Sequence, residues 1–372
     1  MTRICAQGEP EKREAKLFGS CLSRKLIFLV PILFLFLSCA GKPSFYETKE
    51  MILATNRVAF EKKDLIKKFE ERIREGIQRG FLPIIDVEFH YSQRIEIEKL
   101  IKRMDEKGVA LTWLAPGGDR GRSEVSLAWN ELYPDRIVPT TVSGDGKLWH
   151  SGDKGFLDRL ATAVGSGRYF AMGEFEARHY YAGPSTSPDA HTRVDSEGMR
   201  VVFELSKEKS IPFLLHHEAE DMLLPELEVM LAKYPESKVI WCHAGRNRNP
   251  DTWKKFRKPE AVREFLQKYP NLYFNFLGSP PGAIFSGYVE GIMYKISFRG
   301  ITLDPEWKKI IEEFSDRFVL GSDVAPLRFE VRYDRVFDDY RKIILQGVRK
   351  DVAERIAYKN AWKLMTGEDW VD

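Results

Sequence analysis

Side chains that can bind a metal gather near residue 85, where an apolar run alternates with acidic residues and a histidine. In the run PIIDVEFH, over 83–90, the polar positions are Asp86, Glu88 and His90. If this run is a strand, its period of two puts the two carboxylates and the imidazole on one face. Such a face could hold a divalent cation, or it could simply meet solvent, and this stretch alone leaves both interpretations open.

The same residue types recur where later apolar runs end. Three of the seven histidines, His90, His216 and His243, stand at such ends, which chance placement would seldom produce. Acidic residues, Glu174 and Asp323 among them, end other runs. Nitrogen and oxygen ligands together suit Zn²⁺, Mn²⁺ or Fe²⁺, and the carboxylate content argues against an all-histidine zinc site. One or two ions are expected, and the side chains at these ends that could bind them include Glu88, His90, Glu174, His216 and Asp323.

Eight apolar runs have the length and composition of buried parallel strands. They cover 83–90, 109–114, 136–142, 169–176, 211–216, 238–243, 271–276 and 317–323. Amphipathic helical patterns separate them, for example over 225–234, 260–269 and 305–315. Eight such units predict an α/β protein with a closed (β/α)8 TIM barrel over 81–372. An open doubly wound sheet would more often carry a glycine-rich phosphate turn after its first strand, and none stands there. In the barrel, all the candidate ligands would lie at one mouth.

A charged leader over 40–80 precedes the barrel. Leu65, Phe69, Ile73 and Ile77 recur at helical spacing, and Gly80 is a plausible helix stop. The chain as a whole is 43% hydrophobic, enough for a large core, and its net charge of +3 comes from interleaved acidic and basic residues. This charge pattern does not favour binding to nucleic acid.

The N-terminus has the layout of a secretory signal. Arg24 and Lys25 precede an uncharged apolar run over 26–37, and small residues follow it. The run is shorter than the about 20 apolar residues that span a bilayer. The residues over 36–39, at the end of the signal segment 1–39, resemble a bacterial lipobox. This resemblance predicts cleavage just before Cys39, lipidation of Cys39 as the mature N-terminus, and anchoring of an exported protein to the cell envelope, on the periplasmic side. An ordinary cleaved signal and an uncleaved anchor are the alternatives.

Cysteine usage fits this prediction. Cys5 and Cys21 would leave with the signal, and Cys39 would be modified. Cys242 would be the one remaining thiol, so the mature protein could form no internal disulfide. Because Cys242 lies in an apolar run, it is expected to act as a small buried hydrophobic residue rather than a reactive thiol.

Taken in order, four motifs carry a family resemblance. They are Asp86-x-Glu88-x-His90, His216 after two leucines, IWCHAG over 240–245 and LGSD over 320–323. Together they resemble the successive strand-end motifs of the amidohydrolase superfamily, in its amidohydrolase-related branch, across roughly residues 80–365. The resemblance implies a TIM barrel that acts on a small molecule, either as a metal-dependent hydrolase or, less often, as a non-oxidative decarboxylase.

The resemblance also implies roles for single residues. His216, rather than its neighbour His217, would bind metal. Asp323 would bind metal and accept the proton of the attacking water, as a general base. His243 would polarise the substrate carbonyl or bind metal. Glu174 resembles the acidic ligand on the fourth strand of two-metal hydrolases, although it could instead pair with Arg178.

Other polar residues beside these motifs are weaker candidates. Glu176 shares a strand face with Glu174. Arg246 and Arg248 closely follow His243, so they could bind a substrate carboxylate or phosphate, or they could be solvated loop charges. Long loops over 178–194 and 278–301 would emerge at the barrel mouth and shape the pocket.

Glu88 is the main departure from the family pattern, which usually presents His-x-His on the first strand. A carboxylate ligand there would lower the Lewis acidity of the metal and raise the pKa of its bound water. Hydrolysis of an amide, lactone or other ester is the leading hypothesis. Decarboxylation of an aromatic or unsaturated acid is the first alternative, since a Glu-x-His strand is similar to that of some decarboxylases of this branch. A non-catalytic envelope binding protein on the same barrel is the second.

Overall fold

The computed structural model describes residues 61–91, 94–117, 122–179, 190–244, 259–276, 297–298, 302–324 and 329–372. The predicted signal segment with Cys39, the start of the leader, and both Arg246 and Arg248 lie outside these residues. Most of the two long loops lies outside them as well. Within the described part of the chain, no helix combines the length and the apolar character that crossing a membrane requires.

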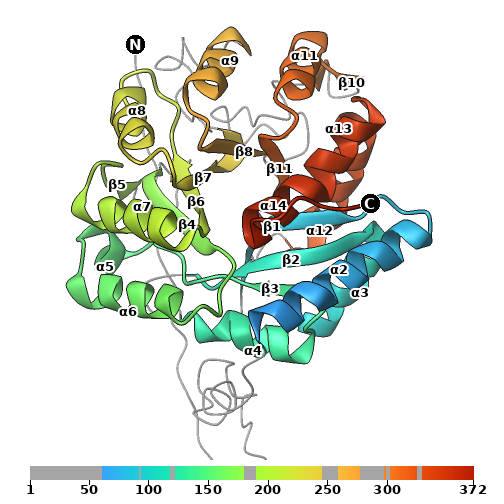
Figure 1. Ribbon diagram of the computed structural model, residues 1–372, viewed down its shortest axis with the longest axis horizontal. Coiled ribbons are helices and arrows are strands. Elements are labelled where there is room, and N and C mark those ends of the chain that lie inside the picture. The colour runs from blue at the N-terminus through green and yellow to red at the C-terminus, as the bar shows by residue number, and fades with distance from the viewer. Residues whose placement is uncertain are drawn as a thin grey trace, which may run out of the picture. The chain divides into compact units, whose positions relative to one another are not determined.

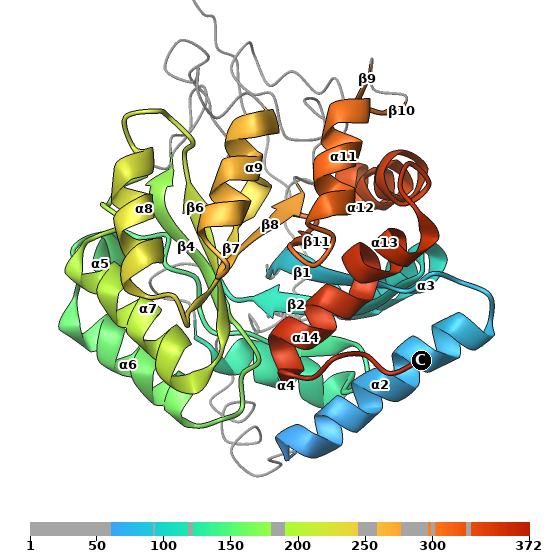
Figure 2. The ribbon, with the colours of Figure 1, turned by 45° about the horizontal axis from the view of Figure 1, so that its top comes forward.

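A mostly parallel sheet forms the centre of the fold, and all eight predicted strands are present (Figures 1 and 2). A two-residue strand, β5, pairs antiparallel with β4 and gives the order β3-β2-β1-β11-β8-β7-β6-β4-β5. The strands are β1 (Ile84–His90), β2 (Val109–Ala115), β3 (Ile137–Pro139), β4 (Met172–His179), β5 (Ala190–His191), β6 (Pro212–His217), β7 (Lys238–Trp241), β8 (Leu272–Phe276) and β11 (Phe318–Leu320). A separate short pair joins β9 (Ser297–Phe298) to β10 (Thr302–Leu303).

The segments that follow β3 and begin β4 also lie side by side. A parallel bridge joins Thr140 to Ala171, and another joins Gly144 to Phe175. The backbone N–H of Gly144 donates to the carbonyl of Glu174 over 2.8 Å. These bonds link the two ends of the run of parallel strands, an arrangement consistent with the predicted TIM barrel.

Helices surround the strands on the outside, as both views show. They are α2 (Lys62–Gln78), α3 (Ile97–Lys107), α4 (Glu124–Leu132), α5 (Lys147–His150), α6 (Lys154–Gly165), α7 (Glu197–Lys209), α8 (Leu224–Lys233), α9 (Pro259–Lys268), α11 (Pro305–Glu313), α12 (Phe329–Asp339), α13 (Lys350–Glu354) and α14 (Asn360–Thr366). The strands are buried on both sides, because one side faces these helices and the other faces the interior of the fold.

The leader helix α2 shows how an apolar stripe positions an element. Leu65, Phe69 and Ile73 are buried against the sheet, whereas Ile77, in the last turn, is 41% exposed. The next helix, α3, ends at Gly108, which takes a left-handed conformation with φ of 66° that closes the helix, and β2 starts directly after it.

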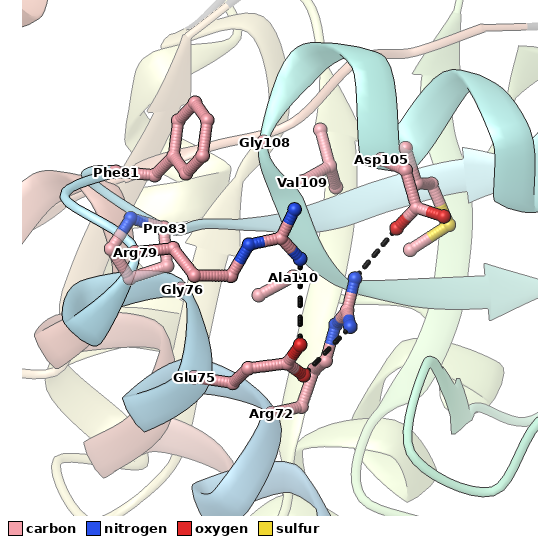
Figure 3. Close-up of a pocket in the computed structure, with 11 residues that line it drawn as sticks. Arg72, Glu75, Gly76, Arg79, Phe81, Pro83, Asp105, Gly108, Val109 and Ala110 are labelled. Carbon is pink, nitrogen blue, oxygen red and sulfur yellow. Dashed lines mark hydrogen bonds and ion pairs between the residues drawn. The ribbon is translucent and has the colours of Figure 1, made fainter.

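A small surface hollow lies between α2 and the amino end of β2 (Figure 3). Its charged groups satisfy one another: Arg72 contacts Glu75 over 3.0 Å and Asp105 over 2.6 Å, and Arg79 contacts Glu75 over 3.4 Å. The hollow opens at the end of the sheet opposite to the predicted site, since it meets β2 at Val109. It therefore has no part in the candidate site.

Candidate metal centre

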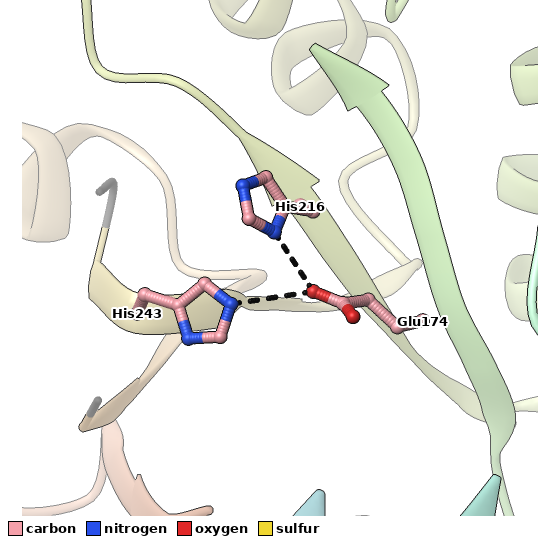
Figure 4. Close-up of side chains that lie close together, drawn as sticks. All are labelled: Glu174, His216 and His243. Atoms are coloured by element: carbon pink, nitrogen blue, oxygen red, sulfur yellow. Dashed lines mark hydrogen bonds and ion pairs between the residues drawn. The ribbon is translucent and has the colours of Figure 1, made fainter. Parts of the chain in front are cut away.

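Three of the predicted side chains lie together, with two imidazoles beside the carboxylate of Glu174 (Figure 4). Glu174 projects from β4, His216 from β6, and His243 from the short turn after β7. Glu174 Oε1 lies 3.0 Å from His216 Nδ1 and 3.4 Å from His243 Nε2. One candidate ligand atom from each residue lies within 4.8 Å of the other two, close enough for all three to bind one cation.

A second group of three adjoins the first. Glu88 and His90 project from the end of β1, and Asp323 follows β11. His90 Nε2 lies 3.5 Å from Asp323 Oδ1 and 3.8 Å from Glu88 Oε1, again within the reach of one cation. The other oxygen of Glu174, Oε2, lies 3.3 Å from His90 Nε2. Glu174 therefore stands between the two groups and presents one oxygen to each.

The side chains of this cluster are almost completely buried, so their polar atoms are largely removed from water. Glu88 and His216 are only 1% and 2% exposed, and His243 is equally enclosed. Glu88 Oε1 is buried with no hydrogen-bond partner among the described residues, and it lies 3.8 Å from both His90 Nε2 and His243 Nε2. Buried polar atoms normally have partners, because desolvation without one is costly. A cation bound between the carboxylates would offset that cost, so the residues present fit a divalent metal.

The three carboxylates differ in their preference for a proton. Burial raises the pKa of Glu88 well above its usual value, and the charges of Glu174 and Asp323 raise it further. Burial also opposes ionisation of Glu174, but hydrogen bonds to His216, His243 and His90 prevail and hold its pKa well below the usual value. The pKa of Asp323 is likewise lowered, because His243 and His90 outweigh the effect of burial. Without metal, Glu88 is the carboxylate that holds a proton.

The three histidines also differ in their pKa values. Burial alone would lower the pKa of His216, yet its contacts with Glu174 and Glu218 prevail and raise it to about 9. The pKa of His90 is raised well above its usual value, since its hydrogen bonds to Asp323 and Glu174 outweigh burial. Burial lowers the pKa of His243, which is therefore neutral at pH 7 and has a free lone pair for a metal or a donor N–H for a substrate oxygen.

Two of the candidate residues sit on strained backbone. His243 has φ of 58° and Asp323 has φ of 46°, and Ser210 is the only other described non-glycine residue with positive φ. Such conformations cost on the order of 1 kcal/mol or more and cluster at functional sites. Here they turn both side chains toward the cluster immediately after their strands end.

Asp86, the first polar residue of the opening run, is not among the converging ligand atoms. Its carboxylate accepts hydrogen bonds from the Ser322 backbone N–H over 2.8 Å and the Ser322 hydroxyl over 2.7 Å. Burial raises its pKa to about 7, although the bonds from Ser322 oppose that shift. Asp86 thus ties the end of β11 to β1 and helps to place Asp323.

The neighbours of the predicted ligands divide between the cluster and the outer side of the sheet. Glu176 accepts from His179 Nδ1 over 2.5 Å, and the His179 ring lies on that of His216, with centroids 3.8 Å apart. His217 instead contacts Glu226 over 3.3 Å. Arg178 forms a two-bond pair with Glu226, so the alternative in which it pairs with Glu174 is wrong.

Sequence reasoning missed several residues of the site. Cys242 is 1% exposed, as expected of a buried hydrophobic residue, but its thiol also lies within 4.8 Å of a ligand atom of Glu88 and of Glu174. Burial and the nearby carboxylates raise its pKa well above the usual value, so the thiol stays protonated. Asn275 on β8 donates to Glu88, yet an asparagine in an apolar strand carried no signal of its own.

The chain was also compared with known proteins, first with solved structures and then with sequences. The solved structures that are similar include a 4-oxalomesaconate hydratase from Rhodopseudomonas palustris, 16% identical with a TM-score of 0.46, covering 76% of this chain and 95% of that one. They also include a 2,6-dihydroxybenzoate decarboxylase, 12% identical with a TM-score of 0.45, covering 76% of this chain and 99% of that one. An amidohydrolase from Bifidobacterium longum subsp. infantis is 13% identical with a TM-score of 0.46, covering 76% and 98% of the two chains.

Sequence comparison is more decisive. No curated protein sequence matches the chain significantly. The sequence model of the amidohydrolase family matches residues 159–365, a range that contains four of the six clustered residues, Glu174, His216, His243 and Asp323. Since this match covers more than half of the 372 residues, the chain belongs to the amidohydrolase family.

Proposed function

We propose that this amidohydrolase is a metal-dependent hydrolase in which metal-activated water attacks an amide, lactone or ester carbon. The observation that carries the proposal is the convergence of three carboxylates and three imidazoles, brought by five different strands to two adjoining groups. The parallel strands and the bridges between β3 and β4 support a closed (β/α)8 barrel as the scaffold.

Two cations are proposed, one in each group of three. Glu88, His90 and Asp323 would hold one, and His216 and His243 the other, with Glu174 shared between them. The mixed nitrogen and oxygen ligands suit Zn²⁺, Mn²⁺ or Fe²⁺. A cation held by these residues would supply Lewis acidity and would lower the pKa of bound water toward neutrality.

Asp323 and His243 are the proposed catalytic residues. Asp323 is ionised at neutral pH because its pKa is lowered, so its carboxylate can accept a proton from the attacking water. His243 is neutral at the same pH, so it can bind a cation or donate a hydrogen bond to the developing oxyanion of the substrate. Arg246 and Arg248 remain proposed contacts for a substrate carboxylate or phosphate.

Glu88 favours a second candidate function, the non-oxidative decarboxylation of an aromatic or unsaturated acid. Its buried carboxylate adds negative charge to the centre, which weakens the activation of water by the metal. A single ion beside an arginine-lined pocket would serve that reaction better than a two-ion hydrolytic centre.

Metal analysis and product analysis together test these proposals. The purified protein should contain one or two equivalents of divalent metal, and His90→Ala, His216→Ala and Asp323→Ala should each lose it. Stoichiometric metal that survives all three changes contradicts the site. Turnover of a panel of amides, lactones and esters supports hydrolysis, whereas release of carbon dioxide from hydroxybenzoates without hydrolysis supports the second candidate. A metal-free protein that retains a ligand tightly would indicate a binding protein.

We also propose that the protein is exported and held at the cell envelope through a lipid on Cys39, as the lipobox-like residues over 36–39 suggest. Labelling of growing cells with a fatty-acid analogue should mark the wild-type protein. Cys39→Ser should abolish the label and release the protein from the membrane fraction. Equal labelling of both proteins would contradict the anchor.

A further inference from the structure

Asn275 on β8 connects two proposed ligands that come from other strands. Its Nδ2 donates a hydrogen bond to Glu88 Oε2 on β1, and its Oδ1 accepts one from the backbone N–H of His243 over 2.6 Å. The side chain is completely buried. Because β11 lies between β8 and β1 in the sheet, Asn275 reaches Glu88 across an intervening strand.

Gly321, directly after β11, leaves the space for this reach. A Cβ atom at Gly321 would lie 2.7 Å from Asn275 Nδ2 and 2.9 Å from Glu88 Cβ, and real Cβ atoms essentially never come so close to other atoms. The φ of Gly321 is not positive, so glycine is needed here for space and not for backbone conformation. Any larger residue would separate the amide from the carboxylate.

The contact decides which oxygen of Glu88 is available. With Oε2 held by the amide, Oε1 is the oxygen that lies 3.8 Å from both His90 Nε2 and His243 Nε2. At its other end, Asn275 holds the backbone of His243 in the left-handed conformation that aims the imidazole at Glu174. One side chain therefore orients a member of each group of three.

We propose that Asn275 is a positioning residue of the metal centre, which makes Glu88 a ligand through one oxygen and fixes His243 at the same time. The inference rests on the proposed function, since it assumes that the cluster binds metal. The contact with Asn275 would hold the Glu88 carboxylate in one orientation, where the family usually has a histidine on the first strand. It also explains why a glycine stands at position 321, since a side chain there would occupy the space that the contact needs.

Asn271 provides a matched control. It is also a buried asparagine, it directly precedes β8, and its Nδ2 donates to the carbonyls of Leu231 over 3.1 Å and Tyr234 over 2.8 Å. Its removal should therefore cost stability as the removal of Asn275 does, but it touches none of the proposed ligands. Any effect on metal binding beyond a general loss of stability should be specific to Asn275.

The first experiment measures the affinity of the metal-free protein for Zn²⁺ and Mn²⁺ by competition with a chelator, and its melting temperature by circular dichroism. Asn275→Leu should weaken metal binding about 10- to 100-fold, the range typical of residues that orient ligands. Asn271→Leu should lower the melting temperature but change the affinity by less than about twofold, a change too small to indicate an effect on ligand orientation. Equal affinities in the two variants would overturn the inference.

Asn275→Asp is the second variant, chosen because it keeps the shape and the acceptor for His243 but replaces the donor to Glu88. Alone it should weaken metal binding at least as much as Asn275→Leu, because two carboxylates then face each other. Combined with Glu88→Gln, it should cost less than it does alone, since the introduced amide can donate to the introduced carboxylate. A cost that is unchanged in the Glu88→Gln background would show that Asn275 does not act through Glu88.

The wild-type protein separates failure of this inference from failure of the proposed function. If wild type binds no metal, the proposed function and this inference both fail. If wild type binds metal stoichiometrically and Asn275→Leu and Asn275→Asp bind it equally well, only the inference about Asn275 is wrong.

Discussion

Adjacent residues of β6, His216 and His217, enter two different clusters of buried acidic and basic groups. His216 faces Glu174 in the candidate metal centre, while His217 faces Glu226 on α8. Both imidazoles are at least 98% buried, and each contacts a carboxylate within about 3.3 Å. The strand alternation alone separates them, because neighbouring side chains point to opposite faces.

The difference lies in how each cluster balances its charge. Beside His217, Arg178 binds both oxygens of Glu226, and Arg193 lies 3.5 Å away, so the carboxylate has its full set of partners. Beside His216, Glu218 and the three carboxylates of the candidate centre face three imidazoles, with no arginine or lysine among the described residues that touch Glu174. The carboxylate of the first cluster is already balanced by arginine, whereas the carboxylates of the second still fit a cation. Similar residue types therefore serve structure in one place and, in the function proposed above, chemistry in the other.

Replacing each histidine in turn should give the largest contrast between the clusters. His216→Ala should weaken metal binding by more than about 100-fold, because even residues that only orient ligands contribute about 10- to 100-fold, and it should abolish turnover. His217→Ala should retain metal and lose stability. Chelator competition and thermal melting of both variants measure this. If the two variants lose metal to the same extent, the division of the strand into a chemical and a structural face is wrong.

Arg178→Met should destabilise the fold with little effect on metal. The change leaves Glu226 buried with one strong partner fewer, and breaking a buried ion pair costs about 3 kcal/mol or more. Urea unfolding of the metal-free protein measures the loss, and Lys154→Met, which removes an exposed i,i+4 pair with Asp158, is a matched control that should change little. A loss of metal with unchanged stability would place Arg178 in the wrong cluster.

Metal affinity should rise with pH in the candidate centre. His216, with a pKa of about 9, and His90, whose pKa is also raised, hold protons at pH 7 in the metal-free protein, and a cation must displace them. Affinity is expected to increase from pH 6 toward pH 9, with proton release that titration calorimetry in buffers of different ionisation enthalpy detects. His217→Ala should keep this pH dependence. Affinity that is flat over this range would mean that the histidines are already neutral.

The stability of the protein at acid pH should depend on the other cluster, which contains His217 and Glu226. This is the smallest of the expected effects. The pKa of Glu226 is lowered to about 2, because its bonds to His217 and Arg178 outweigh burial. A lowered pKa contributes stability above the unfolded value, about 4.5, and this contribution disappears as the pH falls toward 2. The contribution should be about 1 to 2 kcal/mol after allowance for solvent screening. Urea midpoints between pH 5 and 3 should fall less for Glu226→Gln than for wild type, and parallel curves would contradict the assignment.

The sequence was informative where one residue type implies one local structure. Apolar runs such as 109–114 and 271–276 became strands, and the apolar spacing of Leu65, Phe69 and Ile73 became the buried side of α2. The candidate ligands could also be predicted from the sequence. In a parallel α/β fold the carboxyl ends of all the strands lie at one edge of the sheet, whatever the sequence between them. The role of Asn275 could not be predicted from the sequence, because it depends on a contact with Glu88 across β11.

By itself, the sequence determined the alternation of strands and helices and the types of side chain that end each strand, because periodicity and composition are local properties. Only the tertiary structure decided which of those side chains meet. In the tertiary structure Asp86 binds Ser322 while Glu88 joins the candidate centre, Arg178 pairs with Glu226, and Glu174 lies between the two groups of three. The physical reason is that these contacts join residues from β1 to β11 that are far apart in the chain, and their geometry is set by strand order, register and the room left at a single glycine.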